Sequence, residues 1–287
     1  MLKQHEDEIE GTVKLLFQPG EEILEGAKEM VEANVLENPH VDAAMMIHVI
    51  SGSAVKEGTM GVFGPGPAYA SSDWFSIDIQ GIGGHGAAPS YTKNPLGAMC
   101  AIQQGIYEIM AEHRAPADNC VMTVGQMHGG NTGNIIPDSA YMQGTIRTFN
   151  EKVREKLKED LRTLTENTAK ARGVTAQVSF GSCCPAVMVD EKVHESFLRS
   201  MRELLGEENA YDLRTKWGGA FALASSSEDF SYIAEKVPSA VGWFFIGDAR
   251  NGYQYFCHHP KADFNDDLLY VGAAAYVKAS LDWLSRK

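Results

Sequence analysis

Two adjacent glutamates, Glu21 and Glu22, close an apolar run at residues 12–20. The run is predicted to be a buried strand that leads into a helix, and ligands gather at the carboxyl ends of strands in open α/β sheets. Neighbouring carboxylates can divide the work of a hydrolytic metal site, because one binds the cation while the other takes a proton from water. Acidic residues in a first helical turn also favour the helix dipole and need no further purpose. For the pair alone, both interpretations stay open.

Three histidines offer further metal ligands. His48 lies near the end of a second predicted strand at residues 41–49, and His258 and His259 lie in a polar loop before the last predicted helix. Imidazole together with carboxylate suits Zn²⁺, Mn²⁺ or Co²⁺. A structural histidine at a strand end and a solvated loop are the alternatives. The sequence also leaves open whether His258 or His259 is the ligand.

Two glycine-rich loops and one arginine could contact a substrate. His85 lies in the loop at residues 81–89, whose small side chains let an imidazole approach a ligand closely. Asn134 lies in a similar loop at residues 129–137, and Arg147 falls on the polar face of a strand predicted at residues 140–149. A guanidinium there could grip a carboxylate with two hydrogen bonds. Ordinary turns and a solvated strand face are the alternatives, and the glycine spacing does not match a dinucleotide-binding loop.

Composition narrows the class of protein. The 287 residues include 38 acidic and 25 basic side chains, for a net charge of −13, and no basic stripe stands out. This argues against nucleic-acid binding, which needs clustered cations. Neither a membrane-spanning run nor a secretory signal is evident, so a cytoplasmic protein without a membrane partner is expected. The five irregularly spaced cysteines predict no disulfide framework, and most are expected to be buried.

The order of elements predicts an α/β fold with an insertion. A strand–helix–strand pattern at the start, with its helix at residues 21–36, is followed by a Gly/Pro-rich passage at residues 58–67, taken as a crossing between domains. The middle of the chain then reads β-α-β-β-α-β, the ferredoxin-like arrangement. The α/β pattern returns with helices at 191–205 and from 227, a buried strand at 240–246 and a last helix at 265–285. The predicted domains are residues 1–67, 68–183 and 184–287, of which the second is the insert.

Seven short runs follow one another in an order that resembles a known family. They are 18–22 (QPGEE), 47–49 (IHV), 83–85 (GGH), 133–137 (GNIIP), 144–147 (GTIR), 227–230 (SEDF) and 258–260 (HHP). The chain resembles the di-metal aminoacylase-like metallopeptidases, in the amidohydrolase branch that includes hippurate hydrolases and plant indole-acetyl-amino-acid hydrolases. The resemblance spans nearly the whole chain.

The resemblance implies an activity and a role for each candidate residue. The expected reaction is metal-dependent hydrolysis of the amide bond of N-acyl amino acids or related small amides. Glu21 would be the general base, and the implied metal ligands are Glu22, His48 and His258. The implied substrate contacts are His85 and Asn134, which polarise the scissile carbonyl from the lid of a partner subunit, and Arg147, which holds the substrate's carboxylate. The lid of this family is the ferredoxin-like insert, and it implies a homodimer.

The sequence also departs from the family's pattern. Family members carry a further stretch upstream of the glutamate pair, with a Cys-Gly-His-Asp-x-His run that supplies two of five protein ligands, and no such run occurs here. The expectation is therefore an N-terminally incomplete catalytic domain that holds one metal ion or none in place of two. The alternative is a truncated, non-catalytic homologue or gene fragment that acts as a dimerising or ligand-binding module.

Overall fold

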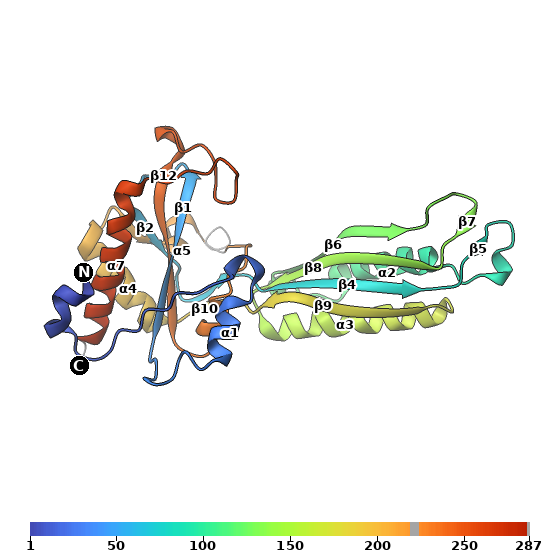
Figure 1. The fold of residues 1–287 in the computed structure, drawn as a ribbon, viewed down its shortest axis with the longest axis horizontal. Helices are drawn as coiled ribbons and strands as arrows, with labels where there is room; N and C mark the ends of the chain where they lie inside the picture. Colours follow the sequence, from blue (N-terminus) through green and yellow to red (C-terminus); the bar gives the residue numbers. More distant parts are fainter. Residues whose placement is uncertain (219–223, 286–287) are drawn as a thin grey trace.

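The computed structural model describes residues 1–218 and 224–285, which form two units joined end to end (Figure 1). An α/β unit is built from both ends of the chain, and a lid unit is built from residues 72–184. Each unit has its own cluster of buried apolar side chains. The predicted α/β fold with a ferredoxin-like insert is confirmed, while the division at residues 67 and 183 stays a prediction. No helix in the described ranges is long and apolar enough to cross a bilayer.

The sheet of the α/β unit has four strands in the order β1-β12-β2-β11. Strand β1 runs parallel to β12, β12 runs antiparallel to β2, and β2 runs parallel to β11. The bounds are β1 (Ala44–Ser53), β2 (Thr59–Val62), β11 (Ala210–Asp212) and β12 (Ser239–Asp248). Nearly every residue of β12 is buried, as expected for an apolar strand between two neighbours.

Helices flank this sheet. On the side away from the lid unit lie α4 (Glu191–Leu205) and α7 (Leu269–Leu284), which pack against each other. Helix α4 begins where the Asp190 carboxylate accepts hydrogen bonds from the Lys192 and Val193 amides. The shorter elements are α1 (Gly26–Glu32), α5 (Leu213–Trp217), α6 (Ser231–Ala234) and the antiparallel pair β3 (Gly66–Tyr69) and β10 (Val187–Val189).

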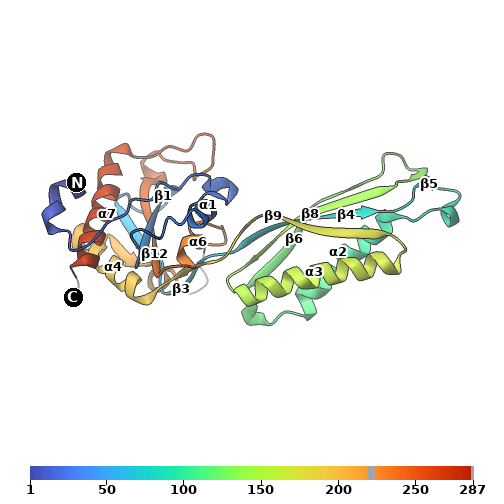
Figure 2. The same ribbon diagram turned by 60° about the horizontal axis from the view of Figure 1, so that its bottom comes forward.

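The lid unit is an antiparallel sheet in the order β6-β8-β4-β9, with helices on one face (Figure 2). The bounds are β4 (Ser72–Gln80), α2 (Pro95–Glu112), β6 (Cys120–Gly129), β8 (Ser139–Thr148), α3 (Glu151–Ala171) and β9 (Thr175–Cys184). Two short paired strands, β5 (Gly84–His85) and β7 (Ile135–Ile136), lie at the tip farthest from the α/β unit in both views. Period-two burial along β4 and β8 explains why these strands were predictable.

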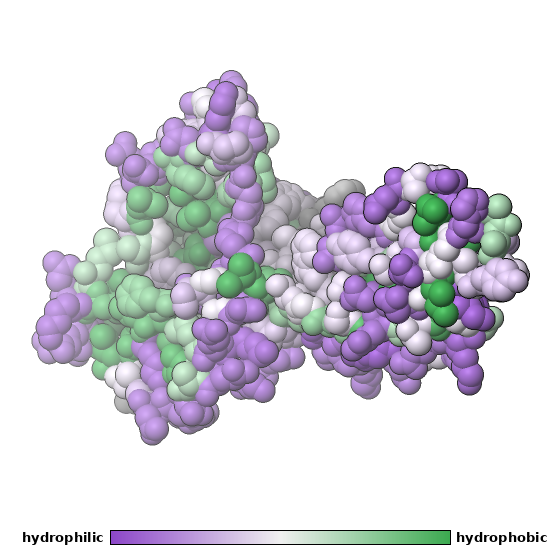
Figure 3. Space-filling model, turned by 45° about the vertical axis from the view of Figure 1, so that its right-hand side comes forward, coloured by the Kyte–Doolittle hydropathy of each residue, from purple (hydrophilic) through white to green (hydrophobic). Residues whose placement is uncertain are grey.

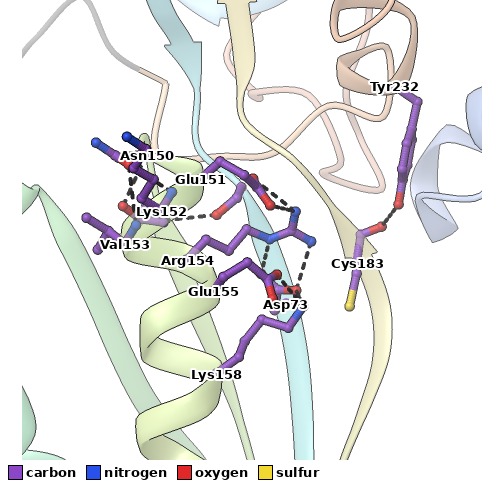
Figure 4. Close-up of polar contacts among 12 residues, drawn as sticks. Asp73, Asn150, Glu151, Lys152, Val153, Arg154, Glu155, Lys158, Cys183 and Tyr232 are labelled. Atoms are coloured by element: carbon purple, nitrogen blue, oxygen red, sulfur yellow. Dashed lines mark hydrogen bonds and ion pairs between the residues drawn. The ribbon is translucent and has the colours of Figure 1, made fainter.

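Polar contacts lie at the end of the lid unit that faces the α/β unit (Figure 4). The Arg154 guanidinium on α3 donates to both oxygens of the fully buried Asp73 carboxylate on β4, at 2.6 and 2.9 Å. Arg154 also donates to Glu151 at 3.0 Å, and the Lys158 ammonium lies 3.7 Å from Asp73, so the buried pair is part of a small charged network. The Tyr232 hydroxyl on α6 donates to the Cys183 carbonyl at the end of β9 and thereby ties the lid unit to the α/β unit.

The predicted strand at residues 12–20 is wrong. This segment has no regular structure, and Phe17 is 85% exposed. A strand needs a hydrogen-bonded neighbour, and the contacts that hold this segment are of another kind: the Lys14 ammonium donates to the carbonyls of Val35, Glu37 and Pro39. Apolar composition alone therefore gave the wrong assignment here.

Several other expectations need correction. The passage at 58–67 is not a plain crossing, since it contains β2, a buried strand inside the sheet. The helix expected at 21–36 is shorter and follows a single 3-10 turn at Glu21–Ile23, because Leu24 adopts a left-handed conformation that interrupts it. The helix expected from residue 227 begins at Ser231. All five cysteines are free, as predicted, but only Cys184 is buried.

Candidate functional site

The glutamate pair lies in a tight loop at the junction between the two units. Gly20 precedes the 3-10 turn with φ 60° and Leu24 ends it with φ 59°, so both flanking residues are left-handed. A Cβ at Gly26 would lie 1.4 Å from the Pro19 carbonyl oxygen, so glycine is required there for the two arms of the loop to touch. The loop thus holds Glu21 and Glu22 at a fixed bend beside the sheet.

Three carboxylates meet on the inner side of this loop. Oxygens of Glu21, Glu228 and Asp229 all lie within 4.8 Å of one another, and Asp229 has no exposed area. Burial, and then the neighbouring charges of Glu22 and Asp229, raise the pKa of Glu21 to about 7. Burial, and then the charge of Glu21, raise the pKa of Glu228 to about 7. Near neutral pH, such groups can both take up and release a proton.

This cluster makes stability depend on pH. Folding raises the pKa of Glu228 from 4.5 to about 7, so its contribution is fully present below pH 4.5 and is lost as the pH rises through 7. In the wild type the Phe230 amide donates to Glu228 Oε1 at 3.1 Å. The Glu228→Gln side chain can still accept this hydrogen bond but carries no charge. At pH 8 in EDTA we expect this variant to be more stable than the wild type by roughly 2–3 kcal/mol.

The measurement is urea unfolding of both proteins at pH 5 and pH 8. The matched control is Glu25→Gln, which removes an exposed carboxyl from the same loop. A wild type as stable at pH 8 as the Glu228→Gln variant would contradict the assignment of a buried, repelled carboxylate.

The expected metal ligands are neighbours but do not form one tight cluster. The His258 Nδ1 atom lies 3.4 Å from the Glu22 carboxylate, and both side chains are well exposed, at 64% and 73%. His48 is close enough for the charges of His258 and Glu22 to act on its pKa, which burial lowers. Among the described residues, the one group of three donors within 4.8 Å is the carboxylate cluster. Glu22, His48 and His258 would therefore have to rotate to share a cation.

The three histidines near the glutamate pair differ in the partners of their ring nitrogens. The His48 Nδ1 atom lies 2.7 Å from the Val49 carbonyl, so it carries the proton and leaves Nε2 available as a ligand. His258 has φ 71°, a left-handed conformation, and its Nδ1 atom faces Glu22. His259 instead accepts a hydrogen bond from the Lys261 amide and stacks on Tyr255 with ring centroids 4.3 Å apart. These contacts favour His258 over His259 as the ligand.

Arg147 reaches from the lid unit to the loop that precedes the carboxylate cluster. Its Nη1 atom donates to the Ser227 hydroxyl at 3.2 Å and to the Ser225 carbonyl at 3.5 Å. The next residue in the chain after Ser227 is Glu228. The guanidinium is therefore a cationic group of the lid unit that lies next to the segment carrying the acidic cluster.

His85 and Asn134 lie together at the lid tip, at the opposite end of the lid unit from this cluster (Figures 1 and 2). The Gly86 amide donates to the Asn134 carbonyl at 2.8 Å and joins the two loops. The Ala87 amide donates to His85 Nδ1, so the proton of the neutral ring is on Nε2. The Thr132 hydroxyl donates to Asn134 Oδ1, which leaves the amide nitrogen as a donor. Within one chain, these donors do not meet Glu21.

Sequence reasoning gave no role to Glu228 and Asp229. The signal was present, because two acidic residues stand between serines and the apolar residues of a predicted helix start. Acidic residues at that position also suit a helix N-terminus. Only the folded chain brings them next to Glu21, from more than two hundred residues away in the sequence.

The fold is that of a metallopeptidase-type α/β chain with a lid. The chain belongs to peptidase family M20/M25/M40, whose model matches residues 1–282. It is 31% identical to an IAA-amino acid hydrolase, ILR1-like 4, of Arabidopsis thaliana, over 99% of this chain and 62% of that protein. It is also 31% identical to the N-acetylcysteine deacetylase of Bacillus subtilis, over 98% of this chain and 69% of that protein. The predicted family resemblance is confirmed.

A solved structure supports the same conclusion about the fold. The YXEP protein of Bacillus subtilis, described as a dinuclear metal binding peptidase from the M20 family, superimposes with a TM-score of 0.76 at 27% identity. The match covers all of this chain and 69% of that one. The chain spans 62% of the length of the plant hydrolase that it matches.

Proposed function

We propose that this protein is a metal-dependent amidohydrolase that cleaves the amide bond of N-acyl amino acids or related small amides. One observation carries the proposal: in a chain of the M20 family, Glu21 lies beside the Glu22–His258 pair, at the junction between the two units. The pKa of Glu21 is raised there to about 7. The names of the plant and bacterial relatives, which act on conjugated or acylated amino acids, support this substrate class.

The donor chemistry fits a divalent cation such as Mn²⁺, Zn²⁺ or Co²⁺. Two imidazoles and a carboxylate from His48, His258 and Glu22 are the ligand types that these ions prefer. The two exposed side chains have room to turn toward His48. When bound, the cation would supply Lewis-acid polarisation of the carbonyl and lower the pKa of a water molecule.

The chain's own residues would move the proton and hold the substrate. Glu21 would take a proton from the attacking water and later give it to the leaving amine, which needs a carboxyl that titrates near the working pH. Arg147 would hold the substrate's carboxylate with its fork of N–H donors. His85 Nε2 and Asn134 Nδ2 would donate hydrogen bonds to the carbonyl oxygen, where negative charge develops.

Because the lid tip lies far from Glu21 in its own chain, His85 and Asn134 would act on the site of a second copy. The edge strand β6 supports such a dimer, since in the described sheet it has a strand on one side only and exposes the apolar side chains of Val121 and Met127. Strand β6 runs from the junction, where Cys120 pairs with Thr148, toward the tip. Antiparallel pairing of two β6 strands about a two-fold axis would bring each tip to the partner's junction.

The tip of the lid unit exposes several large apolar side chains. Ile82, Tyr91 and Ile135 expose 54%, 85% and 45% of their surface around His85. In Figure 3 the lid unit is mostly hydrophilic on the face drawn, with apolar atoms at its near end. Exposed apolar groups of this kind favour packing against another protein surface.

We also propose a cytoplasmic location. All five cysteines are free, which is typical of a reducing compartment. This proposal predicts no dependence of the activity on disulfide formation.

The direct test is hydrolysis of a panel of N-acyl amino acids by the purified chain with added Mn²⁺, Co²⁺ or Zn²⁺. Release of the free amino acid that stops in EDTA and returns on adding metal is the expected result. If no metal gives turnover, the enzymatic proposal is wrong for this chain.

Arg147 offers a test of the substrate class. Arg147→Ala is expected to raise KM for an N-acyl amino acid by about 10- to 100-fold, because the charged hydrogen bonds to the carboxylate are lost. The matched substrate is the same acyl amide without the carboxylate, for which KM should not change. An equal loss on both substrates would show that Arg147 does not hold the carboxylate.

A further inference from the structure

One buried carboxylate closes the loop that carries the glutamate pair. The Gln18 side-chain amide donates to one oxygen of Asp229, and the Ala27 amide donates to the other at 2.8 Å. Gln18 and Ala27 are the two ends of the loop at residues 18–27. A single side chain, which lies more than two hundred residues away in the sequence, therefore holds both arms of the loop.

The loop needs such a clamp because its own structure is weak. Its regular part is the single 3-10 turn at Glu21–Ile23, and the left-handed Leu24 is an unfavourable conformation for a branched side chain. The contact of Gly26 with the Pro19 carbonyl brings the arms together but adds no hydrogen bond that the structure records. Beyond the bonds of the 3-10 turn, the loop has one long backbone bond of 3.5 Å, from the Glu25 amide to the Gly20 carbonyl, so hydrogen bonds from outside the loop contribute much of what holds it.

The charge of Asp229 also requires an explanation. It is fully buried, and an oxygen lies within 4.8 Å of those of Glu21 and Glu228, whose charges oppose it. A residue that only filled space here would be neutral. A carboxylate suits the position because it accepts two hydrogen bonds at once, and bonds to a charged acceptor are the stronger kind.

We propose that Asp229 is a positioning residue that fixes the 18–27 loop and thereby aims Glu21 at the substrate. The catalytic consequence rests on the function proposed above, whereas the clamp itself does not. Asp229→Ala removes both hydrogen bonds. In Asp229→Asn the side-chain oxygen can still accept from Ala27, and its amide can donate to a rotated Gln18 side chain.

The chain offers a matched control. Asp190 also accepts two hydrogen bonds, here both from backbone amides, of Lys192 at 2.9 Å and Val193 at 3.1 Å, at the start of α4. Asp190→Ala thus removes the same kind of contact without touching the 18–27 loop. Two measurements are made on each variant: amide hydrogen exchange across residues 18–27, and kcat and KM with an N-acyl amino acid at saturating Mn²⁺.

Asp229→Ala is expected to exchange about tenfold faster across the loop, and to lose about 100-fold in kcat with little change in KM. Asp229→Asn should restore most of both, and Asp190→Ala should change neither. Exchange in Asp229→Ala as slow as in the wild type, or equally fast in Asp190→Ala, would overturn the proposal.

Failure of the proposed function and failure of the Asp229 clamp give different results. If no protein turns over substrate, including the wild type, the proposed function fails while hydrogen exchange still decides the clamp. If Asp229→Ala does not fold, Gln18→Ala removes one of the two bonds, and its loop should exchange faster than that of the wild type. Unchanged exchange in Gln18→Ala would then overturn the proposal.

Discussion

Glu21→Gln should abolish amide hydrolysis while leaving the fold and metal binding intact. The amide keeps the size of the side chain but cannot take a proton from water, and general-base catalysis contributes about 100- to 10,000-fold. Glu21 is suited to this role because burial and its acidic neighbours raise its pKa to about 7. We therefore expect kcat to fall by about 1,000-fold or more.

Three measurements separate this result from general damage. Removing one of several repelling carboxylates should leave the thermal midpoint at pH 8 no lower than in the wild type. Calorimetry with Mn²⁺ should give a similar affinity, because Glu22, His48 and His258 are unchanged. The control Glu25→Gln removes an exposed carboxyl of the same loop and should keep the full rate. A Glu21→Gln protein with more than a tenth of the wild-type kcat would refute the base assignment.

Two inactive variants should restore activity when they are combined in one dimer. His85→Ala and Glu21→Gln are each expected to be inactive, because each lacks a group that the proposed reaction needs. His85 lies in β5 at the lid tip, far from Glu21 of its own chain, so the two groups of one site come from different chains. In a mixed dimer, one site contains Glu21 from the first chain and His85 from the second. The mixed dimer should therefore have about half of the wild-type activity, and a random mixture of equal amounts, half of whose dimers are mixed, about one quarter.

The control is the double variant Glu21→Gln/His85→Ala. Combined with either single variant, it leaves every site without one of the two groups, so no activity should return. The chains are co-expressed with different tags and the doubly tagged dimer is purified. No recovery in that dimer would mean that His85 does not act across an interface, and a fully active His85→Ala would mean that it does not act at all.

The lid unit was predictable because its sequence pattern and its tertiary contacts agree. Alternating burial along β4 and β8 and the capped helices α2 and α3 are local signals. The predicted order β-α-β-β-α-β is the observed one, and the strand predicted at 140–149 is β8, displaced by one residue. The α/β unit was less predictable. Short strands such as β3, β10 and β11 have only three or four residues and depend on neighbours distant in the sequence, so no local pattern marked them.

The segment before Glu21 shows the limit of composition. Residues 12–20 are as apolar as many strands, yet they pair with no strand among the described residues and are held by Lys14 and Gln18. Hydrophobic patterns report which side chains could be buried. They do not report whether a neighbouring strand is present to share backbone hydrogen bonds.

By itself, the sequence determined the family, the α/β class with its ferredoxin-like insert, and the short list of residues with suitable chemistry, because these depend on residue types, spacing and local periodicity. The tertiary structure alone decided which of them meet. It brought Glu228 and Asp229 next to Glu21, distinguished His258 from its neighbour, and separated His85 from the glutamates. The physical reason is that proximity, burial and pKa shifts arise from contacts between residues far apart in the chain, which no local pattern encodes.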